Sequence, residues 1–243
     1  MSAHQVNANR PSFCLLADNA KLASIFINRG FTRQLSIHKA DVVVFSGRMS
    51  VTPFLYGEKS LEGISYNIGK DKKEVAIFKK LPNKVIKVGF NRGALLLNIL
   101  CGGRSYQMVS GHNDEEHLVY EQGHEKETQF NVFSNHEQMM ITGPMGDTLL
   151  YAKEAIHKRG EKGHIVLQET GLQYVREPEV VLYPSFRTVC CQYELGNNKW
   201  PLPENFLFNV LDERLFEYSG ITGADTLRSD SEIAAELAKN KDS

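Results

Sequence analysis

The chain has 243 residues, 42% of them hydrophobic, and its 28 Lys and Arg residues nearly balance 29 Asp and Glu residues, for a formal net charge of −1. A chain of this length can bury one sizeable core, and the balanced charge gives no overall field that would attract nucleic acid or an anionic membrane. No apolar run approaches the roughly 20 residues that span a bilayer, and the first residues lack a signal-peptide pattern. We therefore expect a cytoplasmic protein that contacts neither nucleic acid nor membrane.

Up to about residue 103, apolar runs alternate with helical patterns. A continuous β-branched run such as DVVVF, 41–45, is typical of a strand buried on both faces of a parallel sheet. Apolar spacing among charged residues predicts helices between such runs. The patterns predict strands over 13–17, 41–45 and 85–90, and helices over 21–30, 70–81 and 94–101. This alternation predicts an α/β fold with a mostly parallel central sheet flanked by helices.

The second half of the chain is less regular. Residues 105–120 are interpreted as a loop, and strands are expected over 129–133, 138–142, 180–183 and 188–193. After Gly196 the pattern predicts two helices. The first covers Pro203 to Tyr218, and its apolar face could pack on the sheet or on another subunit; we favour the sheet. The second begins at a capping box over 229–232. We therefore divide the chain into a main domain, 1–196, and a helical extension, 197–243, that packs on it.

The cysteines of the chain lie in apolar runs and form no C-x-x-C motif. A thiol in such surroundings behaves as a small hydrophobic group, so the pattern favours a reducing compartment. It also favours a buried thiol over a replacement nucleophile at Cys101. The four residues are Cys14, Cys101, Cys190 and Cys191.

Asn91 follows a buried strand and precedes a buried helix. Such a corner lifts one side chain above the carboxyl ends of the strands, where open α/β sheets place their sites. The stretch from Gly89 to Gln107, GFNRGALLLNILCGGRSYQ, resembles the nucleophile elbow of class I glutamine amidotransferases, in particular the γ-glutamyl hydrolase-like relatives encoded by tailed bacteriophages. Their pattern runs G-x-C-R-G-A-Q, then L-N-x-x-x-G-G, then Y-Q.

Three further blocks occur in the order of that family. DVVVFSGRMSVTPFLYGE resembles its glycine-glycine oxyanion loop, SNHEQMM its histidine-glutamine block, and EPEVVLYPSFRTVCCQYELG its closing Q-x-H-P-E segment. The resemblance covers about Asp41 to Gly196. It implies a flavodoxin-like class I glutamine amidotransferase fold, and we expect no cofactor.

The catalytic residues of the family are missing. In the family a cysteine thiolate attacks the glutamine amide, a histidine acts as base and acid, and a glutamate orients the histidine. The resemblance places these three residues at Asn91, Glu194 and Gly196. The substrate-binding glutamine falls at Leu95, and the second oxyanion glycine falls at Arg48, where a positive φ would be strained. We expect the former pocket to contain Gly47, Arg48, Asn91, Arg92, Leu95, Gln107, His136, Gln138 and Glu194.

Several of these residues can be given structural roles. Asn91 suits a capping or hydrogen-bonding role at a helix start. His136 is interpreted as a structural hydrogen-bonding residue near the former pocket, with a general base as the alternative. Arg48 and Glu194 replace residues that would face each other across the site, so we predict a salt bridge that fills the pocket.

The segment from Gly111 to His117, GHNDEEH, contains two histidines and three acidic residues. The histidines are five residues apart, a spacing that suits neither one helix face nor one strand face. The sequence therefore favours a solvated loop here, and we predict no metal site.

The substitutions predict a pseudoenzyme that serves as a binding, regulatory or scaffolding module. The resemblance to phage-encoded relatives implies that it is phage-encoded and acts in the host cytoplasm. Its partner would be a protein that the sequence does not identify, and a homo-oligomer is an open alternative. Two other functions also remain open. One is an active amidotransferase or γ-glutamyl-type amide hydrolase with a remodelled site that uses His136, Glu137 or a cysteine. The other is a structural component of a virion or another assembly.

Overall fold

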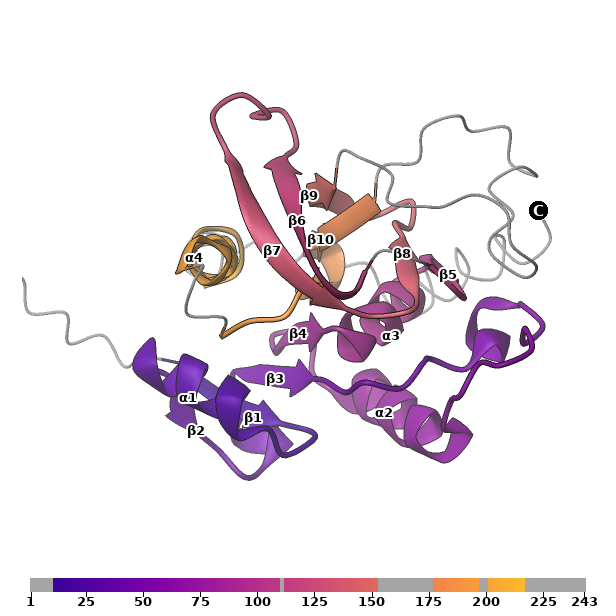
Figure 1. Ribbon diagram of the computed structural model, residues 1–243. Helices are drawn as coiled ribbons and strands as arrows, with labels where there is room; N and C mark the ends of the chain where they lie inside the picture. The colour runs from indigo at the N-terminus through magenta and orange to yellow at the C-terminus, as the bar shows by residue number, and fades with distance from the viewer. Residues whose placement is uncertain (1–10, 110–111, 153–176, 197–200, 217–243) are drawn as a thin grey trace, which may run out of the picture.

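The computed structural model describes residues 11–109, 112–152, 177–196 and 201–216, and its centre is a nine-stranded sheet (Figure 1). The strand order is β2-β1-β3-β4-β11-β10-β9-β6-β7, and β5 and β8 form a separate two-stranded sheet. The strands are β1 (Ser12–Leu15), β2 (Thr32–Arg33), β3 (Val42–Phe45), β4 (Ile86–Phe90), β5 (Arg104–Tyr106), β6 (Asn113–Glu121), β7 (Gln129–Asn135), β8 (Met139–Ile141), β9 (Asp147–Ala152), β10 (Glu177–Tyr183) and β11 (Thr188–Cys191).

The central sheet has a parallel half and an antiparallel half. Strands β2, β1, β3, β4 and β11 run parallel to one another, whereas β10, β9, β6 and β7 continue the sheet with antiparallel pairing. Most of the parallel half is built from the apolar runs that predicted it, but its edge strand β2 is exposed and was not predicted. The antiparallel half contains β6 and β9, which were not predicted, and the interpretation of 105–120 as a loop is wrong because β5 and most of β6 lie there.

Helices cover both faces of the sheet. On one face, α1 (Ala20–Asn28) and α4 (Pro201–Val210) pack together, with the rings of Phe26 and Phe208 5.2 Å apart. On the other face lie α2 (Ile68–Lys80) and α3 (Arg92–Leu100). Short helical turns complete the fold: η1 (Ile37–Lys39), η2 (Pro53–Tyr56), η4 (Pro184–Phe186) and the π-helical η5 (Leu211–Phe216). Helices on both faces of a sheet confirm the predicted flavodoxin-like α/β class.

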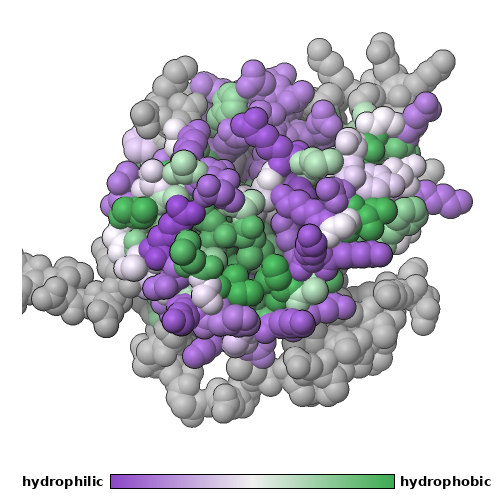
Figure 2. Space-filling view, turned by 90° about the horizontal axis from the view of Figure 1, so that it is seen from below, coloured by the Kyte–Doolittle hydropathy of each residue, from purple (hydrophilic) through white to green (hydrophobic). Residues whose placement is uncertain are grey.

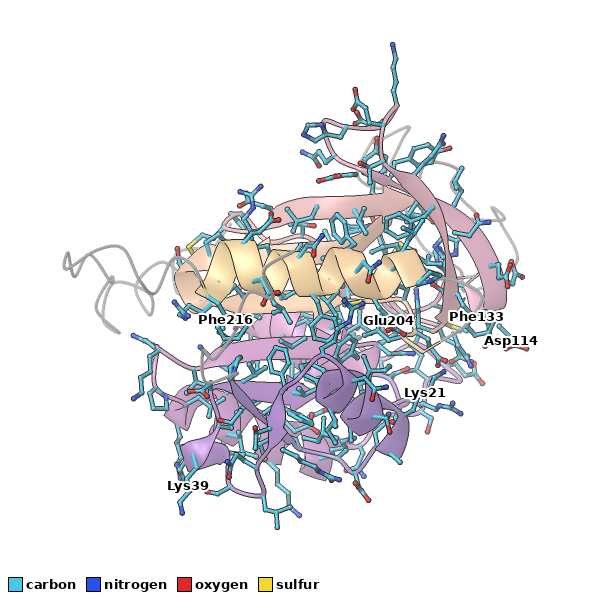
Figure 3. The ribbon with its side chains drawn as sticks, turned by 90° about the vertical axis from the view of Figure 1, so that its left-hand side faces the viewer. Lys21, Lys39, Asp114, Phe133, Glu204 and Phe216 are labelled. Atoms are coloured by element: carbon cyan, nitrogen blue, oxygen red, sulfur yellow. The ribbon has the colours of Figure 1, made fainter. Side chains whose placement is uncertain are left out.

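Up to residue 216, the helix expected over 203–218 is formed by α4 and η5, and it packs on the sheet as we favoured; residues 217 and 218 lie outside the described residues. Leu207 and Leu211 are fully buried in the core between α1 and the strands. Figure 3 shows this helix running along the sheet, with Glu204 toward one end and Phe216 toward the other. The segment 197–200 and the second expected helix, over 229–232 and beyond, lie outside the described residues.

One face of the described part of the molecule exposes apolar side chains. The face seen from below in Figure 2 has apolar residues at its centre with polar residues around them. No helix within the described ranges is long and apolar enough to cross a membrane.

Candidate functional site

Asn91 lies at the sharp turn between β4 and α3, with φ 51° and ψ −116°. A positive φ is costly for a residue with a Cβ atom, so the surrounding packing must hold this conformation. Two glycines allow the strand and the helix to approach so closely. An added Cβ would lie 2.6 Å from the backbone nitrogen of Ala94 at Gly89, and 2.1 Å from the carbonyl oxygen of Phe45 at Gly93. The backbone therefore has the strained strand-to-helix geometry of a nucleophile elbow.

The Asn91 side chain bonds across the site and does not cap α3. Its Nδ2 donates to the carbonyl oxygen of Asn135, at 2.8 Å, and no side-chain cap bond forms at the start of the helix. The predicted hydrogen-bonding role is thus confirmed, whereas the capping role is wrong. Since Asn135 ends β7, this bond ties the elbow to the antiparallel half of the sheet.

One oxyanion donor of such an elbow is already paired. The backbone N–H that follows the nucleophile position belongs to Arg92, and it donates to the carbonyl oxygen of Gly47 at 3.3 Å. In an active elbow that N–H would stabilise the oxyanion of the reaction. The strain expected at Arg48 is absent, because the non-glycine residues with positive φ in the described ranges are Asn91, Asp114 and Arg187.

Arg92 belongs to a buried ion-pair network and not to the pocket wall. Its Nη1 lies 2.5 Å from Oε2 of Glu74, and its Nη2 pairs with Asp71. Asp71 also accepts a hydrogen bond from the backbone N–H of Thr52, at 2.9 Å. The three charged side chains are all buried. Arg92 therefore fastens α2 and the loop after β3 to the start of α3.

A pocket of about 310 Å³ opens beside Asn91. Five of the residues expected in the former pocket line it: Arg48, Asn91, Leu95, His136 and Gln138. Its other lining residues are Met49, Ser50, Ser65, Asn113, Asn135 and Glu137. Four of the expected residues, Gly47, Arg92, Gln107 and Glu194, do not line it. Gln107 instead bonds the backbone of Lys59 and Leu61, at 2.8 and 3.0 Å.

The predicted salt bridge between Arg48 and Glu194 is wrong. No ion pair joins these two side chains in the part of the chain that the structure describes. The backbone N–H of Glu194 bonds the carbonyl oxygen of Phe133 on β7, at 2.8 Å, whereas Arg48 lies in the loop after β3. The pocket consequently stays open.

The thiols offer no replacement nucleophile. All four cysteines are buried, and burial raises the pKa values of Cys101, Cys190 and Cys191 well above the ordinary range. Across the described ranges no hydrogen bond joins a cysteine to a histidine. Because the thiolate is the reactive form, these side chains are inert at neutral pH.

A buried cluster of three histidines and two glutamates lies beside the pocket, and the sequence analysis missed it. His112 Nε2 is 2.8 Å from Glu177 Oε2, and His117 Nε2 is 3.1 Å from Glu179 Oε1. The His112 ring lies 4.6 Å from the His117 ring and 4.8 Å from the His136 ring, measured between centroids. Among these residues, His136 also lines the pocket.

A β-bulge explains why the spacing of the two histidines was misleading. The register of β6 against β7 shifts between Asn113 and Glu115, and Asp114 has φ 62°. In a regular strand, residues five apart point to opposite faces. The extra residue of a bulge reverses this alternation, so His112 and His117 share the inner face. The interpretation of this segment as a solvated loop is wrong, since both histidines are buried. Figure 3 shows Asp114 and Phe133 at the same end of this hairpin.

The buried groups of the cluster shift one another's pKa values. Burial would lower the pKa of His117, but its hydrogen bond to Glu179 and the charge of that residue raise it overall. Burial would raise the pKa of Glu179, but its bond to His117 and the neighbouring imidazoles lower it overall. Burial lowers the pKa of His136 to about 4, so this imidazole is neutral at pH 7.

Two solved structures share this architecture. A glutamine amidotransferase from Thermotoga maritima is similar over 97% of this chain and 94% of its own, with 13% identity and a TM-score of 0.54. A putative GMP synthase component from Thermoplasma acidophilum is similar over 88% of this chain and 98% of its own, with 10% identity and a TM-score of 0.59. These similarities confirm the flavodoxin-like class I glutamine amidotransferase fold.

The fold and the elbow together define a class I glutamine amidotransferase-like protein. The family model for peptidase C26 matches residues 21–153, which is more than half of the sequence. The chain belongs to the peptidase C26 family. No curated protein matches its sequence.

Proposed function

We propose that this protein is a pseudoenzyme, a catalytically inactive glutamine amidotransferase-like protein whose open pocket makes it a binding, regulatory or scaffolding module. The observation that carries the proposal is the residue at the elbow. Asn91 has the backbone conformation of a nucleophile, but a carboxamide cannot form the thioester through which glutamine is hydrolysed in a cysteine-dependent site.

The surroundings of Asn91 support the same conclusion. The Arg92 N–H that would stabilise an oxyanion donates to Gly47. Gly196, at the position that the resemblance gives to the orienting glutamate, has φ 81°, and an added Cβ there would lie 2.3 Å from Cε of Lys21. The Lys21 side chain could move aside, but the positive φ would strain a glutamate at that position. The losses therefore extend beyond one side chain.

The chemistry of the pocket wall indicates what it could hold. Amide groups from Asn113 and Asn135 offer donors and acceptors, Arg48 and Glu137 offer charges of opposite sign, and Leu95 is apolar. This mixture suits a small polar ligand with a carboxylate, or a polar segment of a protein partner, because a guanidinium pairs well with a carboxylate. The phage-like sequence blocks support a phage-encoded protein that acts in the host cytoplasm.

The first rival is an amide hydrolase that uses His136. The observation in its favour is that a neutral imidazole lies in the pocket wall. However, no thiol lines the pocket, and none of the described thiols is exposed. The second rival, a structural role in an assembly, gains little from α4, since this helix buries Leu207 and Phe208 against the sheet.

Two measurements on the purified full-length protein test the proposal. The first is ammonia release from glutamine and from γ-glutamyl amides, with an active amidotransferase as the positive control. We expect no release above the background without protein. If the wild type releases ammonia and the His136→Gln variant does not, the protein is an amide hydrolase and the pseudoenzyme proposal is wrong. The second is calorimetric titration with glutamine and glutamate, in which Arg48→Ala is expected to weaken any binding at the pocket about tenfold.

A further inference from the structure

Three side chains of the histidine cluster converge with unpaired atoms. The ligand atoms of His112, His136 and Glu179 all lie within 4.8 Å of one another, and the three side chains are buried. In the part of the chain that is described, His112 Nδ1, His136 Nε2 and Glu179 Oε2 have no hydrogen-bond partner. A buried polar atom without a partner costs about 1 to 3 kcal/mol, so three in one place require an explanation.

Neighbouring groups orient both imidazoles. His112 Nε2 lies 2.8 Å from the Glu177 carboxylate, which can only accept, so this nitrogen carries the proton and Nδ1 carries the lone pair. His136 Nδ1 lies 2.8 Å from the carbonyl oxygen of Gln138, which also only accepts; we assign the proton there, which leaves the lone pair on Nε2. The amide Nε2 of Gln192, 2.8 Å from the same Nδ1, donates to that carbonyl at 2.6 Å. A carboxylate or carbonyl behind each imidazole is typical of metal-ligating histidines.

The buried charges of the cluster also favour a bound cation. Glu177 and Glu179 are both fully buried, and two carboxylates in the interior need compensating positive charge. One divalent cation supplies two positive charges at the point where the unpaired atoms meet. His117, bonded to Glu179 by its Nε2, positions that carboxylate in the same way that Glu177 positions His112.

We propose that His112 Nδ1, His136 Nε2 and the Glu179 carboxylate bind a divalent transition-metal ion, with Zn²⁺ as the ion that suits this donor set best. Imidazole and carboxylate ligands are typical of Zn²⁺, at roughly 2.0 to 2.2 Å from the ion, which sets neighbouring ligand atoms about 3.4 Å apart. His112 Nδ1 is already 3.4 Å from Glu179 Oε1. His136 Nε2 is 4.0 Å from the same oxygen, so this imidazole has to move closer when the ion binds. Three protein ligands leave one tetrahedral position for water.

Such an ion would join three segments that are distant in the sequence. His112 precedes β6, His136 lies between β7 and β8, and Glu179 is on β10. The ion would tie the start of β6 and the end of β7, and with them one wall of the pocket, to β10. This inference does not depend on whether the pocket is catalytic, because it concerns how the wall is fixed.

The wild-type protein gives the first test. Full-length protein is treated with a chelator, checked for folding by circular dichroism, and titrated with Zn²⁺ by calorimetry and with Co²⁺ by absorption. We expect one ion per chain, visible Co²⁺ bands of a nitrogen and oxygen site, and a higher melting temperature with Zn²⁺. Absence of binding up to about 100 μM metal would overturn the proposal. A thiolate-to-Co²⁺ charge-transfer band would also overturn it, because that band would place the ion on cysteines.

Variants identify the ligands. His136→Gln and Glu179→Gln should each weaken Zn²⁺ binding more than about 100-fold, and Glu177→Gln should weaken it about 10- to 100-fold through the orientation of His112. His124→Gln is the matched control, because the His124 side chain is 64% exposed, and it should bind as the wild type does. Equal Zn²⁺ affinity in His136→Gln and the wild type would overturn the assignment. If a variant fails to fold, the stoichiometry and Co²⁺ spectrum of the wild type still decide.

Discussion

The two halves of the central sheet contribute different features beside the pocket. In the parallel half, the turn at Asn91 has the backbone of a catalytic elbow, but the side chain at its tip is a carboxamide. In the antiparallel half, buried imidazoles and carboxylates gather around His112 and Glu179, where the family resemblance predicted nothing. The comparison shows that elbow geometry and reactive chemistry are separable.

The close packing around the elbow does not depend on the side chain at its tip. Gly89 and Gly93 allow β4, α3 and β3 to approach closely, and the Arg92 network binds α2 to the same corner. None of these contacts uses the side chain at position 91. A corner held in this way can lose its nucleophile and keep its shape, and the predictions that follow test each half of this contrast.

The largest effect is expected when the ion network under the elbow is broken. Asp71→Ala leaves the buried guanidinium of Arg92 with one partner fewer, so we expect the free energy of unfolding to fall by about 3 to 5 kcal/mol. Urea denaturation measures it. Asp18→Ala, which breaks the exposed pair with Arg33, is the control and should cost less than about 1 kcal/mol. Equal losses in the two variants would show that the network does not hold the elbow.

The next largest effect tests the close approach of α3 to β3. In Gly93→Ala the new Cβ would lie 2.1 Å from the carbonyl oxygen of Phe45, so backbone must move and we expect a loss of about 3 kcal/mol. Gly69→Ala is the matched control, since it lies in α2 with its nearest contact at 3.4 Å. For Gly69→Ala we expect the free energy of unfolding to rise by about 0.5 to 1 kcal/mol. If Gly93→Ala left the free energy of unfolding unchanged, the corner would not be tightly packed.

A pH-dependent effect tests the interior of the parallel half. Burial lowers the pKa of Lys87 on β4 to about 8, although its Nζ donates to the carbonyl oxygen of Phe186. Between pH 8 and the unfolded value near 10.5 the unfolded chain binds more protons, so stability rises with pH. Relative to Lys87→Met, the wild type should gain roughly 2 to 3 kcal/mol in its free energy of unfolding from pH 7.5 to 10. Parallel pH profiles of the two proteins would contradict this prediction.

The smallest effect tests the bulge that gathers the histidines in the antiparallel half. Asp114 has φ 62°, so Asp114→Gly should stabilise the protein by about 0.5 to 1 kcal/mol and Asp114→Val should destabilise it by about 1 to 2 kcal/mol. Glu115→Gly is the control, because Glu115 has no positive φ and glycine should cost about 0.5 to 1 kcal/mol there. A loss of stability in Asp114→Gly would show that the bulge needs the Asp114 side chain.

The sequence predicted the parallel half well, apart from the exposed edge strand β2, because its other strands are apolar runs. Strands such as β3 and β4 bury every residue, and a single stretch of sequence is enough to recognise them. The strand β6 begins with polar residues and contains a bulge, which breaks the alternation that identifies a half-buried strand. Its identity depends on pairing with β7 and β9, and this pairing is not local.

The sequence likewise predicted only part of the site. The positions of Asn91, Leu95 and His136 in one pocket were predicted from the resemblance of their sequence blocks to those of the family. The partners of Arg92 could not be predicted in this way, because Asp71 and Glu74 look like surface charges on an amphipathic helix. The histidine cluster likewise depends on contacts between residues about sixty positions apart, such as His112 and Glu177.

The most direct test of the central claim is covalent labelling of the pocket. A glutamine analogue with a diazoketone electrophile would be incubated with the wild-type protein, and the intact mass would be measured before and after, with an active amidotransferase as the positive control. The proposed absence of a nucleophile at Asn91 predicts an unchanged mass for this protein and one adduct for the control. An adduct on the wild type, mapped to any residue of the pocket wall, would contradict the account.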